Sequence, residues 1–119
     1  DSQHITGHTA SVRQAIRYIR EHFLENISID YVISISGLGH SSFHRHFLEE
    51  TGMTPCQFIM SLRIEQAKNL LSFTHIPIGE IGALCGYEDH VYFSRIFRRC
   101  TGMSPTAYRK LTESNADNR

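Results

Sequence analysis

The motif Phe-x-Arg-x-Phe occurs twice in the chain, centred on Arg45 and Arg95. Phenylalanines four residues apart lie on one face of a helix, so if both pack inward the arginine between them lies on the outer face. An exposed guanidinium presents two parallel N–H donors, which match the O6 and N7 acceptors of guanine in the major groove of DNA. A lone surface arginine is usually just a solvated side chain, but its return at the same place in a second motif favours base readout.

The other outward positions of the two expected helices also suit a nucleic acid. They are Ser41, His44 and Leu48 in the first motif, and Val91, Ser94 and Arg98 in the second. Small and polar side chains let a helix lie close to base edges, whereas Leu48 is interpreted as packing or as a partly exposed filler rather than as a thymine contact. Free backbone N–H groups at the expected helix starts, 40–42 and 90–92, attract phosphate. The predicted phosphate contacts are His40, Ser42, Tyr92, Arg98 and Arg99.

Eight histidines raise the hypothesis of a metal site. His40 and His44 are four residues apart, a spacing that brings two imidazoles onto one metal ion. No third ligand is expected beside them, because Cys56 lies beyond a turn and His46 points to another face. Two ligands seldom hold zinc. We therefore expect no metal and no cofactor, with His44 as a groove contact and His46 as a partly buried packing residue.

An enzyme and a protein-interaction module are two competing hypotheses. A nucleophilic cysteine needs a base and a lowered pKa, and Cys85 precedes a turn glycine with no histidine beside it. The sequence has no paired carboxylates and no phosphate-binding glycine loop, so we expect no enzyme. A helical interaction module without DNA readout would not need basic residues on both second helices. A salt titration with duplex DNA separates these classes, because counterion release weakens only a DNA complex.

An internal repeat surrounds the two motifs and indicates how they are positioned. Residues 43–58 and 93–108 are identical at seven of sixteen positions, where unrelated segments would match at about one. Duplication of one supersecondary unit explains this similarity. With one residue of slippage the repeat extends upstream, through the pairs Ile29 and Ile78, Val32 and Ile81, and Gly37 and Gly86.

Each copy predicts a helix-turn-helix unit. A short helix with apolar residues three apart leads through a glycine turn into a second helix. The second helix ends at Gly52 or Gly102, since glycine suits the left-handed residue that follows a helix. Thr54 and Ser104 are then expected to cap the next helix, with proline at its first position.

The remaining segments complete an all-α fold of seven helices, homeodomain-like and without strands. An amphipathic helix is expected over about 9–24, capped by Thr9 or Ser11, because apolar residues recur there at helical spacing. One long helix over 55–73 joins the two units. The predicted division is a flexible tail (1–8), the first helix-turn-helix subdomain (9–53), the linker helix (54–73), the second subdomain (74–112) and a second flexible tail (113–119).

Composition describes one globular domain whose basic charge is local. The 119 residues are 40% hydrophobic and 20% charged, with a formal net charge of zero. Two windows contain no acid: 40–48, with one arginine and three histidines, and 90–100, with three arginines and one histidine. Phosphates respond to charges within roughly 8 Å, so these windows matter more than the total.

Three features bear on the compartment and on completeness. Three cysteines without a C-x-x-C pair argue against a disulfide framework and favour a reducing cytosol. No apolar run approaches the ~20 residues that cross a bilayer, and no signal peptide is recognised, so we expect a cytoplasmic protein without a membrane partner. Because the chain begins with Asp1 and not Met, we expect it to be part of a longer protein.

Residues 28–110 resemble the DNA-binding domain of the AraC/XylS family of bacterial transcription regulators. The second unit follows the family signature most closely, at Ile78, Glu80, Ile81, Cys85, Gly86, Tyr87, Asp89, Tyr92, Phe93, Ser94, Arg95, Phe97, Arg98, Arg99, Thr101, Gly102, Met103, Ser104, Pro105, Tyr108 and Arg109. The resemblance implies two recognition helices in successive major grooves on one face of the duplex. It assigns base reading to Ser41, His44, Arg45, His90, Ser94 and Arg95, with Val91 also facing the groove.

The same resemblance implies partners and a location. Members of the family usually activate transcription by touching RNA polymerase, and many carry a separate N-terminal domain that senses a small molecule or dimerises. A regulator of this kind is expected in the bacterial cytoplasm, associated with the nucleoid.

The chain departs from the family pattern at four positions. Where the family commonly has alanine in the first helix of each unit, this chain has Ile33 and Gly82. We expect the bulky Ile33 to splay the first unit slightly. Gly39 replaces the usual serine cap, at a small cost, and Val91 stands where a polar residue is frequent. The first unit is therefore expected to read its part of the site less strongly.

Overall fold

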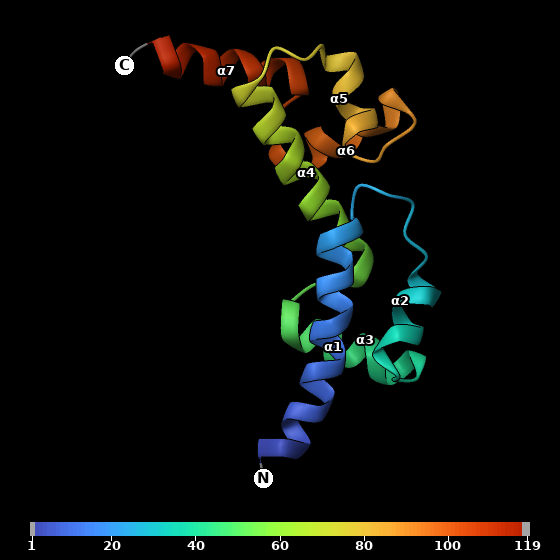
Figure 1. The fold of residues 1–119 in the computed structure, drawn as a ribbon. Coiled ribbons are helices and arrows are strands. Elements are labelled where there is room, and N and C mark those ends of the chain that lie inside the picture. The colour runs from blue at the N-terminus through green and yellow to red at the C-terminus, as the bar shows by residue number, and fades with distance from the viewer. Residues whose placement is uncertain (1, 118–119) are drawn as a thin grey trace. The chain divides into compact units, whose positions relative to one another are not determined.

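A computed structural model describes residues 2–117 of the chain, with side chains for residues 11–114. Within this part the secondary structure consists of seven helices and no strand, which confirms the predicted all-α fold (Figure 1). The helices are α1 (Ser2–His22), α2 (Ile29–Ser36), α3 (His40–Thr51), α4 (Pro55–Phe73), α5 (Ile78–Leu84), α6 (His90–Thr101) and α7 (Pro105–Asp117). No helix in the described part is both long and apolar enough to cross a membrane.

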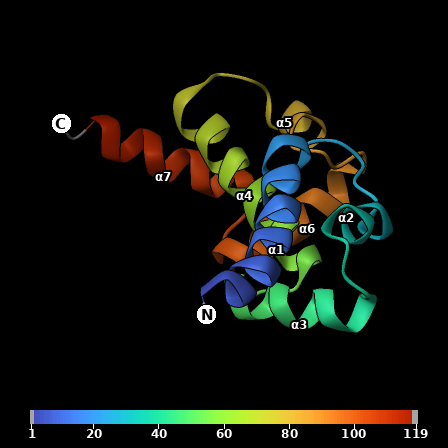
Figure 2. The same ribbon diagram turned by 60° about the horizontal axis from the view of Figure 1, so that its bottom comes forward.

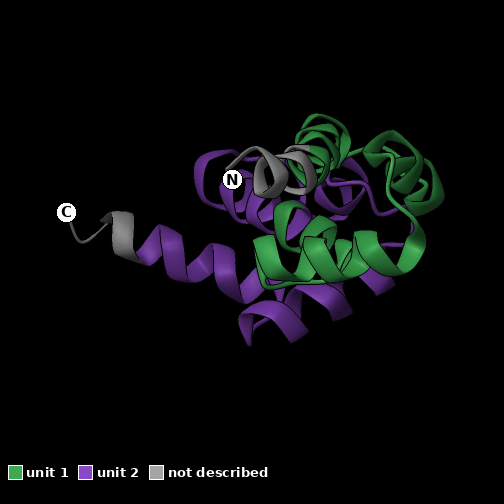
Figure 3. Ribbon diagram, turned by 90° about the horizontal axis from the view of Figure 1, so that it is seen from below, with its two compact units in different colours: residues 1–62 green, residues 63–119 purple. Residues whose placement is uncertain are grey.

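The chain divides into two compact units, residues 1–62 and 63–119, and the boundary falls inside α4 (Figure 3). The sequence treated 54–73 as a linker separate from both units. In the structure the first half of α4 belongs to unit 1, where Phe58 and Ile59 are buried, and the second half belongs to unit 2, where Ile64, Ala67 and Leu71 are buried. Each half of the helix therefore completes one core.

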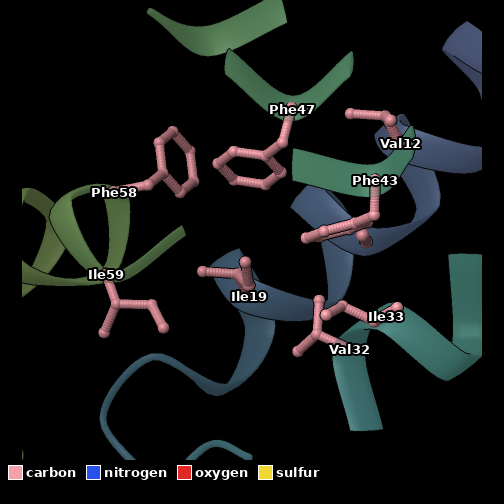
Figure 4. Packing of buried hydrophobic residues seen from close by; sticks show 9 residues of the cluster. Val12, Ile19, Val32, Ile33, Phe43, Phe47, Phe58 and Ile59 are labelled. Atoms are coloured by element: carbon pink, nitrogen blue, oxygen red, sulfur yellow. The ribbon is translucent and has the colours of Figure 1, made fainter. Parts of the chain in front are cut away.

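An apolar cluster holds together the described part of unit 1. Helix α1 packs against both α2 and α3 (Figure 2). The cluster comprises Val12, Ala15 and Ile19 of α1, Val32 and Ile33 of α2, Phe43 and Phe47 of α3, and Phe58 and Ile59 of α4 (Figure 4). The Phe47 and Phe58 rings meet edge to face, with centroids 5.6 Å apart. That geometry is a favoured aromatic arrangement, and it ties α3 to α4.

Ile33 is packed within this cluster and not pushed out of it. Its side chain is only 4% exposed, and it lies near Val32 and Phe43 in the close-up view (Figure 4). Burying an isoleucine in this way contributes on the order of 1.5–3 kcal/mol to stability. The expected splaying is therefore replaced by a filled core position.

At the position of unit 2 that corresponds to Ile33, the contact between the first and second helices is made by a glycine. Gly82 in α5 is buried, and a Cβ atom built on it would lie 3.0 Å from Cγ and Cδ2 of Phe93. The ring of Phe93 thus rests directly on the backbone of α5. Ile81, Cys85, Ile96 and Phe97 complete the buried set contributed by α5, α6 and the turn between them.

The repeat extends to individual hydrogen bonds at the end of each second helix. The Thr51 hydroxyl donates to the carbonyl of Phe47 (2.8 Å) and accepts from the amide of Met53 (3.1 Å). Thr101 makes the same two bonds, at 2.8 and 3.3 Å. Gly52 and Gly102 follow with φ of 74° and 84°, which confirms their predicted left-handed conformation.

The helices that follow begin as predicted. The Thr54 hydroxyl accepts from the amide of Gln57 (3.2 Å), and the Gln57 side chain accepts from the amide of Thr54 (3.0 Å), forming a capping box. Ser104 accepts from the amide of Ala107 (3.1 Å). Proline stands at the first position of both α4 and α7, where its missing N–H costs nothing.

Both terminal helices extend beyond their predicted ends. Helix α1 begins at Ser2, so Thr9 and Ser11 lie inside it and are not N-caps. Helix α7 continues to Asp117. No proline precedes Thr9 or follows Pro105, so no fixed φ angle interrupts the helical backbone in either segment. The flexibility expected for 1–8 and 113–119 stays a prediction, and residues 1, 118 and 119 lie outside the described part.

The C-terminus of α4 is closed by a residue far away in sequence. The guanidinium of Arg109 in α7 donates to the carbonyls of Leu71 (3.1 Å), Thr74 (3.3 Å) and Leu70 (3.4 Å). Carbonyls in the last turn of a helix lack partners further along it, and a cation there also interacts favourably with the helix dipole. Arg109 therefore serves as a structural anchor of unit 2.

Two glycines of α5 provide a matched test of the α5–α6 contact. Gly79 has open space around it, so Gly79→Ala should raise the free energy of unfolding by about 0.5–1 kcal/mol through helix propensity. Gly82→Ala forces a methyl group against Phe93, and overpacking typically costs about 1–3 kcal/mol. Both substitutions gain helix propensity, so the difference between them is the cost of overpacking. In urea unfolding we therefore expect Gly82→Ala to be less stable than Gly79→Ala by about 1–3 kcal/mol. An equal gain from both substitutions would show that Phe93 yields freely.

Candidate nucleic-acid interface

The outward face of α3 has the composition expected from the sequence. Phe43 and Phe47 are completely buried, while Ser41, His44 and Arg45 are exposed. Leu48 is 51% exposed, so it is part of this surface and not of the core. The inward packing of the two phenylalanines thus sets the rotation of the helix about its axis.

The outward face of α6 is similar, with one exception. His90, Val91 and Arg95 are exposed, and Val91 is 65% exposed, which is unusual for a β-branched apolar residue. Ser94 is only partly exposed. Ile96, which the spacing argument did not assign, is buried together with Phe93 and Phe97, so α6 has three inward residues where α3 has two.

The arginines of both helices are available to a ligand. Among the described side chains of residues 11–114, no carboxylate forms an ion pair with Arg45, Arg95, Arg98 or Arg99. Arg13 of α1, by contrast, is paired with Glu50 at 3.1 Å. Unpaired, solvated guanidinium groups on one helix face can donate to base edges or phosphates without first breaking an internal ion pair.

The N-termini of the two helices differ, and the expectation of free backbone amides at both is not met in full at α6. At α3 the N-cap is Gly39, which has no side chain to accept a hydrogen bond. At α6 the N-cap is Asp89, whose Oδ1 accepts from the amides of Val91 (2.9 Å) and Tyr92 (3.3 Å). Two of the three amides expected to be free at the start of α6, those of Val91 and Tyr92, are therefore already engaged, beside a negative charge. An aspartate directly before a helical segment is a common capping signal, and it could have been recognised from the sequence.

The three histidines of α3 each have different neighbours and do not form a cluster among the described residues. The ring centroids of His40 and His44 are 6.4 Å apart, and His40 Nε2 lies 3.8 Å from the carboxylate of Asp30. His44 stands edge-on to Phe43, at 5.5 Å. His46 is partly buried, as expected, and approaches Glu49 at 3.4 Å. Within the described residues, no three potential ligands gather in a metal-binding group.

Cys85 is a packing residue with an unreactive thiol. It is completely buried, and burial raises its pKa to about 11, although the nearby Arg63 acts in the opposite direction. A thiol with so high a pKa supplies almost no thiolate at neutral pH. Cys56 and Cys100 are exposed and form no disulfide.

Tyr87 supports the start of α6, a role that the sequence analysis did not assign. Its ring centroid lies 5.9 Å from Tyr92 and 5.8 Å from Phe93. The guanidinium of Arg63 lies 5.1 Å above the ring, a cation–π contact. Burial raises the pKa of the Tyr87 hydroxyl, which the charge of Arg63 partly offsets. Arg63 and Tyr87 are distant in sequence, so no local sequence pattern predicts their contact.

Comparison with known proteins places these features in context. A protein-family model described as a helix-turn-helix domain matches residues 34–111. The chain is 36% identical over 107 residues to the arabinose operon regulatory protein of Escherichia coli K12, covering 89% of this chain and 37% of that protein. It is 35% identical over 101 residues to the xylose operon regulatory protein of the same strain, covering 85% and 26% respectively. The chain thus spans well under half the length of these curated relatives.

A solved structure gives the same picture. The DNA-binding domain of AdpA, a global transcriptional factor crystallised in complex with a target DNA, matches with a TM-score of 0.81 at 27% identity. The match covers 87% of this chain and 94% of the AdpA chain. The similarity therefore extends over both helix-turn-helix units and is not limited to one motif.

The cap of α6 can be tested by separating its hydrogen-bonding role from its charge. Asp89→Ala removes the acceptor for two amides and should lower the free energy of unfolding by about 0.5–2 kcal/mol. Asp89→Asn keeps an acceptor of similar capping strength and should retain most of the stability. Thermal unfolding of the two variants makes the comparison. Equal losses would contradict the assignment, because they would mean that the charge and not the hydrogen bonds holds this helix start.

Proposed function

Because the chain belongs to the AraC/XylS family of helix-turn-helix transcription regulators, we propose that it binds double-stranded DNA in a sequence-specific manner through α3 and α6. The family consists of regulators with a DNA-binding domain and not of enzymes. One observation carries the proposal: Arg45 and Arg95, without an ion pair among the described side chains, stand at the same position on the outer faces of two repeated helices.

Base reading is assigned to the side chains on these outer faces. In unit 1 they are Ser41, His44 and Arg45, and in unit 2 they are His90, Val91, Ser94 and Arg95. The arginines can donate two hydrogen bonds to guanine, and the exposed valine can contact the methyl group of thymine. Because Ser94 is partly buried and its side chain is short, it can contact a base only where the helix lies close to the base edges.

Phosphate contacts are assigned to His40 and Ser42 at the start of α3 and to Tyr92, Arg98 and Arg99 on α6. The absence of a capping side chain at Gly39 favours the first pair. The backbone amide of Tyr92 is engaged by Asp89, so a contact from Tyr92 would use its phenol hydroxyl. Arg98 and Arg99 are exposed, and an arginine side chain keeps its charge at every physiological pH.

Two readers on one chain imply an asymmetric binding mode. The domain would bind as a monomer, with α3 and α6 in successive major grooves on one face of the duplex. Helix α4 contributes to both cores and contains no internal glycine or proline, which favours a stiff connection. Its 19 residues correspond to about 28 Å of helix, compared with about 34–36 Å for one turn of DNA.

The whole protein is proposed to be a longer bacterial regulator, because the relatives are much longer than this chain. A further N-terminal domain would sense a small molecule or dimerise. The DNA-bound protein would activate transcription through contact with RNA polymerase, in the cytoplasm and associated with the nucleoid.

A salt titration with duplex DNA tests the proposed function directly. Neutralising several phosphates releases counterions, so the logarithm of affinity should fall linearly with the logarithm of salt concentration, with a slope of about −0.9 for each phosphate contacted. Fluorescence anisotropy with a labelled duplex provides the measurement. A chain that bound duplex DNA with no salt dependence, or not at all, would instead be a helical interaction module.

Base reading by the two arginines predicts a loss that depends on sequence. On a site selected from a random duplex library, Arg45→Ala or Arg95→Ala should cost about 1–3 kcal/mol and relax the preference at one base pair. Arg17→Ala is a suitable control, since Arg17 is exposed on α1, outside both second helices. If an arginine variant lost equal affinity on selected and random DNA, that arginine would contact only phosphate.

The spacing of the two readers predicts a strict helical phase. Protected major-groove segments should lie on one face of the duplex, centred about 10–10.5 base pairs apart and without inverted symmetry. Inserting about five base pairs between them rotates one segment to the far face and should abolish simultaneous contact. Footprinting and titration of the two duplexes make the test. Undiminished affinity after the insertion would rule out two rigidly connected readers.

A further inference from the structure

The neutral total charge of the chain conceals an uneven division between its units. Unit 1, residues 1–62, contains four arginines and lysines against six aspartates and glutamates, a formal net charge of −2. Unit 2, residues 63–119, contains eight against six, a net charge of +2. A polyanion such as DNA is therefore attracted to one unit and, on balance, repelled by the other.

The difference is concentrated at matching positions of the two second helices. Where α6 has Arg98 and Arg99, α3 has Leu48 and Glu49 at the aligned positions of the repeat. All four side chains are exposed. Because both helices end in the same threonine and glycine arrangement, the aligned positions occupy equivalent places within their units. The comparison therefore isolates charge from geometry.

The two helices carry their charge at opposite ends. On α6 the acidic group is at the N-terminus, where Asp89 caps the helix, and the basic groups are in the last turn. On α3 the N-terminus has no acidic cap, and Glu49 and Glu50 stand near the C-terminus. Surface charges act on phosphates within roughly 8 Å, so the last turn of α6 attracts the DNA backbone and the last turn of α3 does not.

We propose that unit 2 supplies the salt-dependent hold on the DNA backbone through Arg98 and Arg99, while unit 1 reads bases and contributes no arginine or lysine to its phosphate contacts, which are assigned to His40 and Ser42. This division of labour rests on the proposed DNA-binding function. It means that unit 2 dominates binding to random sequence, and that unit 1 discriminates among sites already engaged by unit 2.

Two double substitutions at the aligned positions test the division. Arg98→Gln with Arg99→Gln should weaken binding to a random-sequence duplex more than about tenfold at moderate salt. It should also reduce the magnitude of the salt slope by about 2, since each lost phosphate contact removes about 0.9. Leu48→Gln with Glu49→Gln should leave the slope unchanged and the affinity for random DNA equal or higher. Thermal unfolding should show that both variants remain folded, because all four positions are exposed.

The outcomes separate this inference from the proposed function. If the unsubstituted chain binds duplex DNA with a steep salt dependence but the Arg98 and Arg99 variant keeps the same slope, the division of labour is wrong and DNA binding stands. A similar loss of slope in the Leu48 and Glu49 variant would also overturn it, because anchoring would then be shared. Absence of salt-dependent binding by the unsubstituted chain would overturn the proposed function itself.

Discussion

In both α3 and α6, the burial of two phenylalanines determines which side of the helix faces outward. Phe43 and Phe47 in α3, like Phe93 and Phe97 in α6, have no exposed surface. Turning either helix by one residue, about 100°, would expose a ring and press an arginine toward the core. A buried, unpaired guanidinium is far more costly than an exposed one. Packing of the two rings thus forces Arg45 and Arg95 outward without any direct contact that holds them there.

Hydrogen bonds at the helix ends determine where α3 and α6 stop. Thr51 and Thr101 bond backward to the carbonyl four residues before them and forward across the turn. The glycine that follows takes a left-handed conformation in both units. As a result α3 and α6 both contain twelve residues. Equal lengths place equivalent side chains equally far from the turn, which is what makes the two faces comparable position by position.

The two repeats differ at the contact between their first and second helices and at the N-cap of the second helix. Unit 1 fills its first-helix contact with Ile33, whereas unit 2 leaves Gly82 against the ring of Phe93. Unit 1 leaves the N-terminus of its second helix without a capping side chain, whereas unit 2 caps it with Asp89. The same scaffold therefore presents two second helices that differ in charge and in N-terminal capping, a difference on which the proposed division of labour depends.

The sequence alone determined the helices, the repeat, the glycine stops, the proline starts and the outward arginines. Each of these depends on residues within about one helical turn, where spacing and capping chemistry act locally. Only the tertiary structure decided that α4 is divided between two cores, that Arg109 closes its C-terminus, and that Phe93 rests on Gly82. These contacts join residues distant in the sequence, and their geometry follows from how whole helices pack, which no local pattern records.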